Sequence, residues 1–89
     1  MSFTPEMVAE MKVLALFDLN STQEGLKVHH TADPALIEAA KRLYAKDLIT
    51  QTDGGYLTSL GRDSVENVKT LLTILTTEPF VEVPLKELA

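Results

Sequence analysis

Cysteine and tryptophan are absent from this chain of 89 residues. Without cysteine the protein can form neither a disulfide scaffold nor a thiolate metal site, and this composition fits a reducing compartment. No apolar run approaches the roughly 20 residues of a membrane-spanning helix. The start, Met1-Ser2-Phe3-Thr4, shows no basic region followed by an apolar one, as a secretory signal would. We therefore expect a cytoplasmic protein with no membrane partner.

Motifs for catalysis and phosphate binding are also missing. There is no Gly-x-Gly-x-x-Gly or Gly-Lys-Ser/Thr loop, and Ser59 does not stand in the Gly-x-Ser-x-Gly elbow of hydrolases. His29 and His30 are the only histidines, and adjacent residues on a helix do not face the same way. The sequence predicts no enzyme, no cofactor and no metal site.

Acidic residues outnumber basic ones, which gives a net charge of −5. Residues 27–62 are the exception, because they hold five Lys or Arg against four acidic residues. An acidic chain disfavours non-specific binding to nucleic acid. Any contact with DNA is therefore expected in this middle third.

The length indicates one domain, which can bury roughly 60–65% of the surface of the unfolded chain. We expect this domain to span residues 1–78. The remaining residues, 79–89, begin with the apolar stretch Phe80-Val81-Glu82-Val83-Pro84-Leu85. This tail is expected to pack on the domain or on a partner.

A β-hairpin over residues 48–58 is the clearest local signal. Leu48-Ile49-Thr50 and Tyr56-Leu57-Thr58 are β-prone and flank Asp53-Gly54-Gly55. Tight hairpin turns need positive φ angles, which glycine adopts without strain. The fold class predicted is mainly α with this small β-hairpin.

Helical patterns surround the hairpin. Capping residues and apolar spacing predict helices over about residues 5–19, 34–46 and 59–75, and Ser21-x-x-Glu24 indicates a fourth over 22–29. The alternative for the last segment is a short extended piece, Leu26-Lys27-Val28. In the helix over 34–46, the outer face is expected to carry Ala35, Glu38, Ala39, Arg42 and Lys46, with Lys41 on its flank, and the inner stripe to carry Leu36, Ile37, Ala40, Leu43 and Tyr44.

This order of elements resembles a winged helix-turn-helix domain over roughly residues 5–75, with the hairpin as the wing. The segment Tyr56–Arg62 is similar to the Leu-Thr-x-x-Gly-Arg that leaves the wing in regulators of the multiple-antibiotic-resistance (MarR) type. The whole chain also resembles a small bacterial family of conserved proteins of unassigned function. The stretch from Asn20 to Thr58 carries that second resemblance.

Two functions follow as hypotheses. The first is a small winged-helix protein that binds double-stranded DNA, with a transcriptional regulator as the role that the resemblance implies. The DNA-contacting residues would be Arg42, Lys46, Lys41, Arg62 and Lys27. The alternative is a protein–protein interaction module, favoured by the acidic Asp33 and Glu38 and by a wing without Lys or Arg.

We also expect a homodimer. The first helix is apolar over most of its circumference, and the last helix repeats apolar residues at coiled-coil spacing. The expected interface residues are Leu14, Phe17, Val65, Val68, Leu72 and Leu75. The alternative is that these two helices bury each other within one chain.

Overall fold

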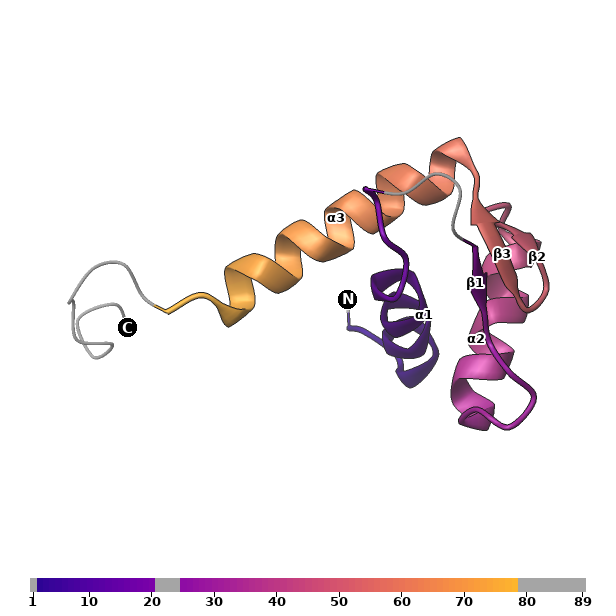
Figure 1. The fold of residues 1–89 in the computed structure, drawn as a ribbon. Coiled ribbons are helices and arrows are strands. Elements are labelled where there is room, and N and C mark those ends of the chain that lie inside the picture. Colours follow the sequence, from indigo (N-terminus) through magenta and orange to yellow (C-terminus); the bar gives the residue numbers. More distant parts are fainter. Residues whose placement is uncertain (1, 21–24, 79–89) are drawn as a thin grey trace.

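The computed structural model describes residues 2–20 and 25–78, which form three helices and a three-stranded sheet (Figure 1). The elements are α1 (Pro5–Ala15), β1 (Leu26–Lys27), α2 (Pro34–Ala45), β2 (Ile49–Gln51), β3 (Gly54–Leu57) and α3 (Ser59–Thr76). The predicted class, mainly helical with a small hairpin, is confirmed, and the arrangement is compatible with a winged-helix-like fold. The tail predicted over residues 79–89 lies outside the described residues.

Helix α1 begins as predicted and ends earlier. The Thr4 hydroxyl accepts a hydrogen bond from the Met7 amide at 3.1 Å, and Pro5 occupies the first turn. The helix was expected to reach residue 19 but ends at Ala15. Beyond it, the Asp18 carboxylate accepts from the Asn20 amide at 2.8 Å, a local bond that competes with helical bonding.

The helix predicted over residues 22–29 is wrong for residues 25–29, where the extended alternative is right. Strand β1 pairs antiparallel with β3, with Leu26 opposite Gly55 and Lys27 opposite Gly54. Gly54 has a φ of +127°, and a Cβ there would overlap the Leu26 carbonyl oxygen. Because Gly54 has no side chain, the third strand can approach and pair with this edge of the hairpin. The capping-box residues, 21–24, lie outside the described residues.

The hairpin predicted over 48–58 is confirmed, and its sheet has the order β1-β3-β2. Thr52 and Asp53 connect β2 to β3, so the glycine pair belongs to β3 rather than to the tip. The chain enters β2 from α2 through Asp47, whose φ is 64°. The Asp47 and Leu48 amides donate to the carbonyls of Tyr44 and Leu43, each at 3.0 Å, as in a Schellman cap.

The start of α3 is fixed to the base of the hairpin. The Thr58 hydroxyl accepts from the Gly61 amide at 3.0 Å and donates to the Asp47 carbonyl at 2.6 Å. A Cβ at Gly61 would overlap the Leu48 carbonyl oxygen. In this chain, Thr58 and Gly61 of the Leu-Thr-x-x-Gly-Arg segment therefore hold the helix against the sheet.

Helix α1 contacts both α2 and α3, and all three helices contribute to the core. The buried apolar residues are Ala9, Val13, Leu14, Phe17, Ala39, Ala40, Leu43, Ile49 and Val65. The first half of α3 lies on this core. Its second half extends past α1, away from the sheet, and residues 71–76 are all exposed (Figure 1).

Candidate interaction surface

Arg42 and Lys46, the first two residues expected to contact DNA, both pair with α1, although the Lys46 side chain stays 56% exposed. Arg42 Nε lies 3.3 Å from Glu10 Oε2, and Lys46 Nζ forms an ion pair with Glu10 Oε1. Arg42 Nη2 also donates to the Glu6 carbonyl at 3.2 Å. The Glu10 side chain is only 9% exposed, and pairing with these two cations lowers the free-energy cost of burying a charged group there. Both cations thus have a structural role in the packing of α1 on α2.

The outward face of α2 carries Ala35, Glu38 and Lys46 as predicted, but two positions differ. Ala39, expected outside, is fully buried, whereas Tyr44, expected inside, is 47% exposed. The reason is that α2 packs against α1 as well as against the sheet, which turns its buried side toward Ala39. Lys41 does face solvent, 2.8 Å from Glu38. The hydrogen bond from Lys41 lowers the pKa of the Glu38 carboxyl.

The other two residues expected to contact phosphate lie apart from α2. Arg62 Nη2 donates to the Leu19 carbonyl at 3.0 Å and holds the segment after α1. Lys27 is exposed on the edge strand β1. Three of the five predicted cations are therefore carried by α2 or its C-cap, and the other two by α3 and β1.

An open apolar groove of about 560 Å³ runs between α1 and α3, and we call it the α1–α3 groove. Its lining consists of Phe3, Val8, Met11, Lys12 and Ala15 on the α1 side and Asn67, Val68, Leu71, Leu72 and Leu75 on the α3 side. Eight of these ten side chains are apolar. The groove forms because α3 continues after it has left the core.

The residues predicted for a dimer interface divide into two groups. Leu14, Phe17 and Val65 are buried in the core of the single chain, so they are not available at its surface. Val68, Leu72 and Leu75 line the α1–α3 groove, and Leu75 is 72% exposed. The sequence prediction did not include Phe3, Val8 or Leu71.

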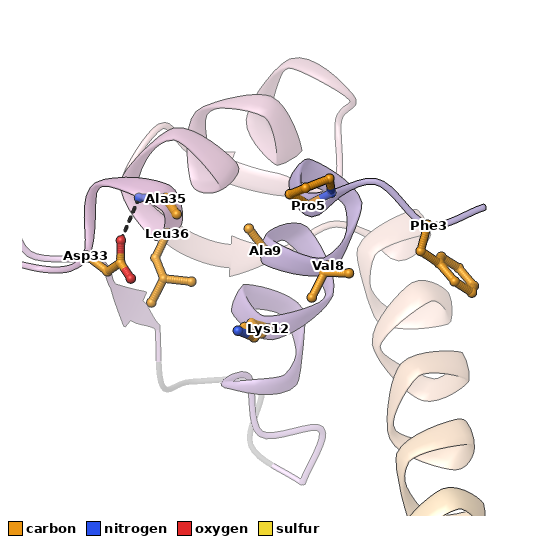
Figure 2. Close-up of a pocket in the computed structure, with 8 residues that line it drawn as sticks. All are labelled: Phe3, Pro5, Val8, Ala9, Lys12, Asp33, Ala35 and Leu36. Atoms are coloured by element: carbon orange, nitrogen blue, oxygen red, sulfur yellow. Dashed lines mark hydrogen bonds between the residues drawn. The ribbon is translucent and has the colours of Figure 1, made fainter.

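A second, smaller hollow of about 420 Å³ lies on the side of α1 that faces α2 (Figure 2). It is lined by Phe3, Pro5, Val8, Ala9, Lys12, Asp33, Ala35 and Leu36. Asp33, the only acidic residue in this lining, caps α2 by accepting from the Ala35 amide at 2.9 Å. The remaining lining is mainly apolar. Phe3, Val8 and Lys12 line both hollows.

The described ranges, residues 2–20 and 25–78, also bear on metal binding and on membrane insertion. Within these ranges, no three His, Asp or Glu side chains are placed so that they could hold a metal ion. His29 and His30 are exposed before α2. Among the described helices, none combines the length and the apolar character needed to cross a membrane.

Comparison with known proteins gives one match. A family model described as "Family of unknown function (DUF5669)" matches residues 1–76. No curated protein and no solved structure matches the chain.

Proposed function

The chain belongs to DUF5669, a family of unknown function, and we propose from its geometry that it is a non-catalytic protein–protein interaction module. The α1–α3 groove is the proposed binding surface. The observation that carries the proposal is that five large apolar side chains, which the fold leaves exposed, meet in this one groove. They are Phe3, Val8, Leu71, Leu72 and Leu75. Contiguous exposed apolar surface of this kind is typical of interaction sites.

The composition of α3 supports the same proposal. Residues 70–77 contain no charged residue, although the chain as a whole is 24% charged. A solvated helix end normally carries charged side chains, and fully buried interface cores are depleted of them. The end of α3 is therefore suited to a partner with an apolar surface.

DNA binding by α2 and the wing is the competing hypothesis. It requires several cations on a continuous face, because phosphate contacts provide most of the affinity. Arg42 and Lys46 bind Glu10, and Lys41 is paired with Glu38. Residues 48–58 contain no Lys or Arg. These positions make the protein-binding hypothesis the better supported of the two.

The experiment compares wild type with two variants of α3. Leu75→Glu places a charge in the α1–α3 groove, and Thr73→Glu places the same charge on a residue outside the groove lining. Proteins that bind immobilised wild type are identified by mass spectrometry, purified and titrated against all three forms. We expect Leu75→Glu to weaken binding at least tenfold and Thr73→Glu to have little effect.

A second titration, with mixed-sequence duplex DNA at low salt, tests the competing hypothesis. We expect no binding. The proposal would be overturned in favour of DNA if the protein bound the duplex and the slope of log affinity against log salt concentration became shallower by about 0.9 with each phosphate-contacting cation removed. The first variants to compare with wild type are Arg42→Ala and Lys41→Ala.

A further inference from the structure

We propose that the occupant of the α1–α3 groove is a second copy of this chain. This inference rests on the proposed function, because it names the partner of the same surface. The arrangement is a closed, two-fold symmetric homodimer in which each chain presents the same patch to the other. The patch differs from the sequence-based interface, since Leu14, Phe17 and Val65 are already buried within one chain.

The apolar patch of the α1–α3 groove is large enough to form one side of a dimer interface. The five exposed side chains of the groove range from 36% exposed for Val8 to 72% for Leu75. With typical side-chain areas, they present on the order of 500 Å² of apolar surface per chain, comparable with the largest patches on soluble monomers. A standard interface buries about 800 Å² per partner, of which roughly 56–65% is non-polar. The patch thus supplies about the apolar area that one side of such an interface needs.

The distribution of charge also favours self-association through this surface. Two copies of a chain with a net charge of −5 repel each other, and the repulsion is weakest when their contact surface avoids the acidic residues. Among the residues that the structure describes, Lys12 is the only charged one in the lining of the α1–α3 groove, and none of the lining residues is acidic. Self-association through this surface therefore keeps the acidic side chains out of the contact.

The shape of the α1–α3 groove also favours pairing with a second copy. Helix α3 has 18 residues and α1 has 11, so at about 1.5 Å per residue α3 is roughly 10 Å longer. Its last turns extend beyond α1 (Figure 1). Leu72 and Leu75 there form one wall of the groove and at the same time an exposed ridge. A surface that offers both a ridge and a groove can pair with its own copy by a two-fold rotation.

The test is sedimentation equilibrium of wild type, Leu75→Glu, Leu72→Glu and Thr73→Glu from micromolar to millimolar concentration. We expect wild type and Thr73→Glu to have twice the 9.8 kDa mass of one chain. Both leucine variants should have the mass of one chain while circular dichroism shows native helix content. Leu75 is largely exposed, so its substitution leaves the fold of the single chain intact.

Three results would overturn the inference. Wild type at 9.8 kDa throughout excludes the homodimer. A dimer that persists in both leucine variants places the contact on another face. A molecular mass that keeps increasing with concentration beyond that of a dimer contradicts a closed two-fold arrangement. If wild type is monomeric but a different protein binds in a Leu75-dependent manner, the inference fails while the proposed function stands, so the two failures are distinguishable.

Discussion

The two halves of α3 have similar apolar spacing and opposite surroundings. In the first half, Val65 is fully buried, and Thr58 and Gly61 hold the helix against the base of the hairpin. In the second half, Leu71, Leu72, Ile74 and Leu75 are all exposed. Apolar periodicity therefore indicates that a helix face requires a partner, but it does not indicate whether that partner belongs to the same chain. The predictions below test this difference between an anchored half and an unpartnered half.

The largest effect is expected for Gly61→Ala in the anchored half. Replacing glycine by alanine inside a helix normally stabilises it by about 1 kcal/mol. Here the added Cβ meets the Leu48 carbonyl oxygen, so the backbone must shift, and we expect a loss of about 3 kcal/mol. Chemical denaturation measures the change. Thr70→Ala in the other half is the control, and a stabilising Gly61→Ala would show that α3 is not held against the hairpin.

A pair of truncations compares the two halves directly. Val65→Ala removes two methyl groups from a fully buried site and should cost about 2–3 kcal/mol. Leu75→Ala removes a larger but exposed side chain and should change the unfolding free energy of the single chain by less than about 0.5 kcal/mol. Denaturant unfolding at the lowest workable concentration measures both. Equal losses would mean that the two halves are equally buried.

Glu10→Gln tests what holds α1 on α2. The change removes the charge that Arg42 and Lys46 share while it keeps the shape of the side chain. Because hydrogen bonds to charged groups are worth about 1.5–3 kcal/mol, we expect a loss near 2 kcal/mol, against almost none for the exposed Glu66→Gln. DNA affinity should stay undetectable. A gain in DNA binding would show that Glu10 had been masking a nucleic-acid-binding face.

A small gain in stability is expected at Asp47, whose carbonyl accepts the hydrogen bond from Thr58. Its φ of 64° is the left-handed conformation that glycine adopts more easily. Asp47→Gly should therefore stabilise the protein by about 0.5–1 kcal/mol. Asp47→Ala removes the same carboxylate without relieving the backbone, so thermal unfolding should show no gain. A gain in stability in both variants would show that it comes from the loss of the Asp47 carboxylate charge and not from the backbone.

Local signals predicted much of this fold from the sequence. Capping residues located the starts of α1, α2 and α3, and the glycine pair located the hairpin. Two features, the strand at residues 26–27 and the rotation of α2, depend on long-range contacts and were not settled by local signals. Residues 26–27 form a strand because Gly54 and Gly55 open the edge of β3 to them.

The predicted site residues show the same limit. The rotation of α2 depends on its packing against α1, which buries Ala39 and directs Arg42 and Lys46 to Glu10. No spacing within residues 34–46 contains that information, because Glu10 lies in a different helix. Helical periodicity did identify Leu72 and Leu75, but only the lengths of α1 and α3 show that these side chains are left exposed.

The most direct test of the account asks whether the α1–α3 groove is covered in solution. Because the chain contains no cysteine, Leu75→Cys and Thr73→Cys each introduce a single thiol. The rate of alkylation is measured for both variants over a range of protein concentrations. The account predicts that the thiol at position 75 reacts at least tenfold more slowly than the thiol at 73 in concentrated protein, and equally fast after dilution. Equal rates at every concentration would contradict it.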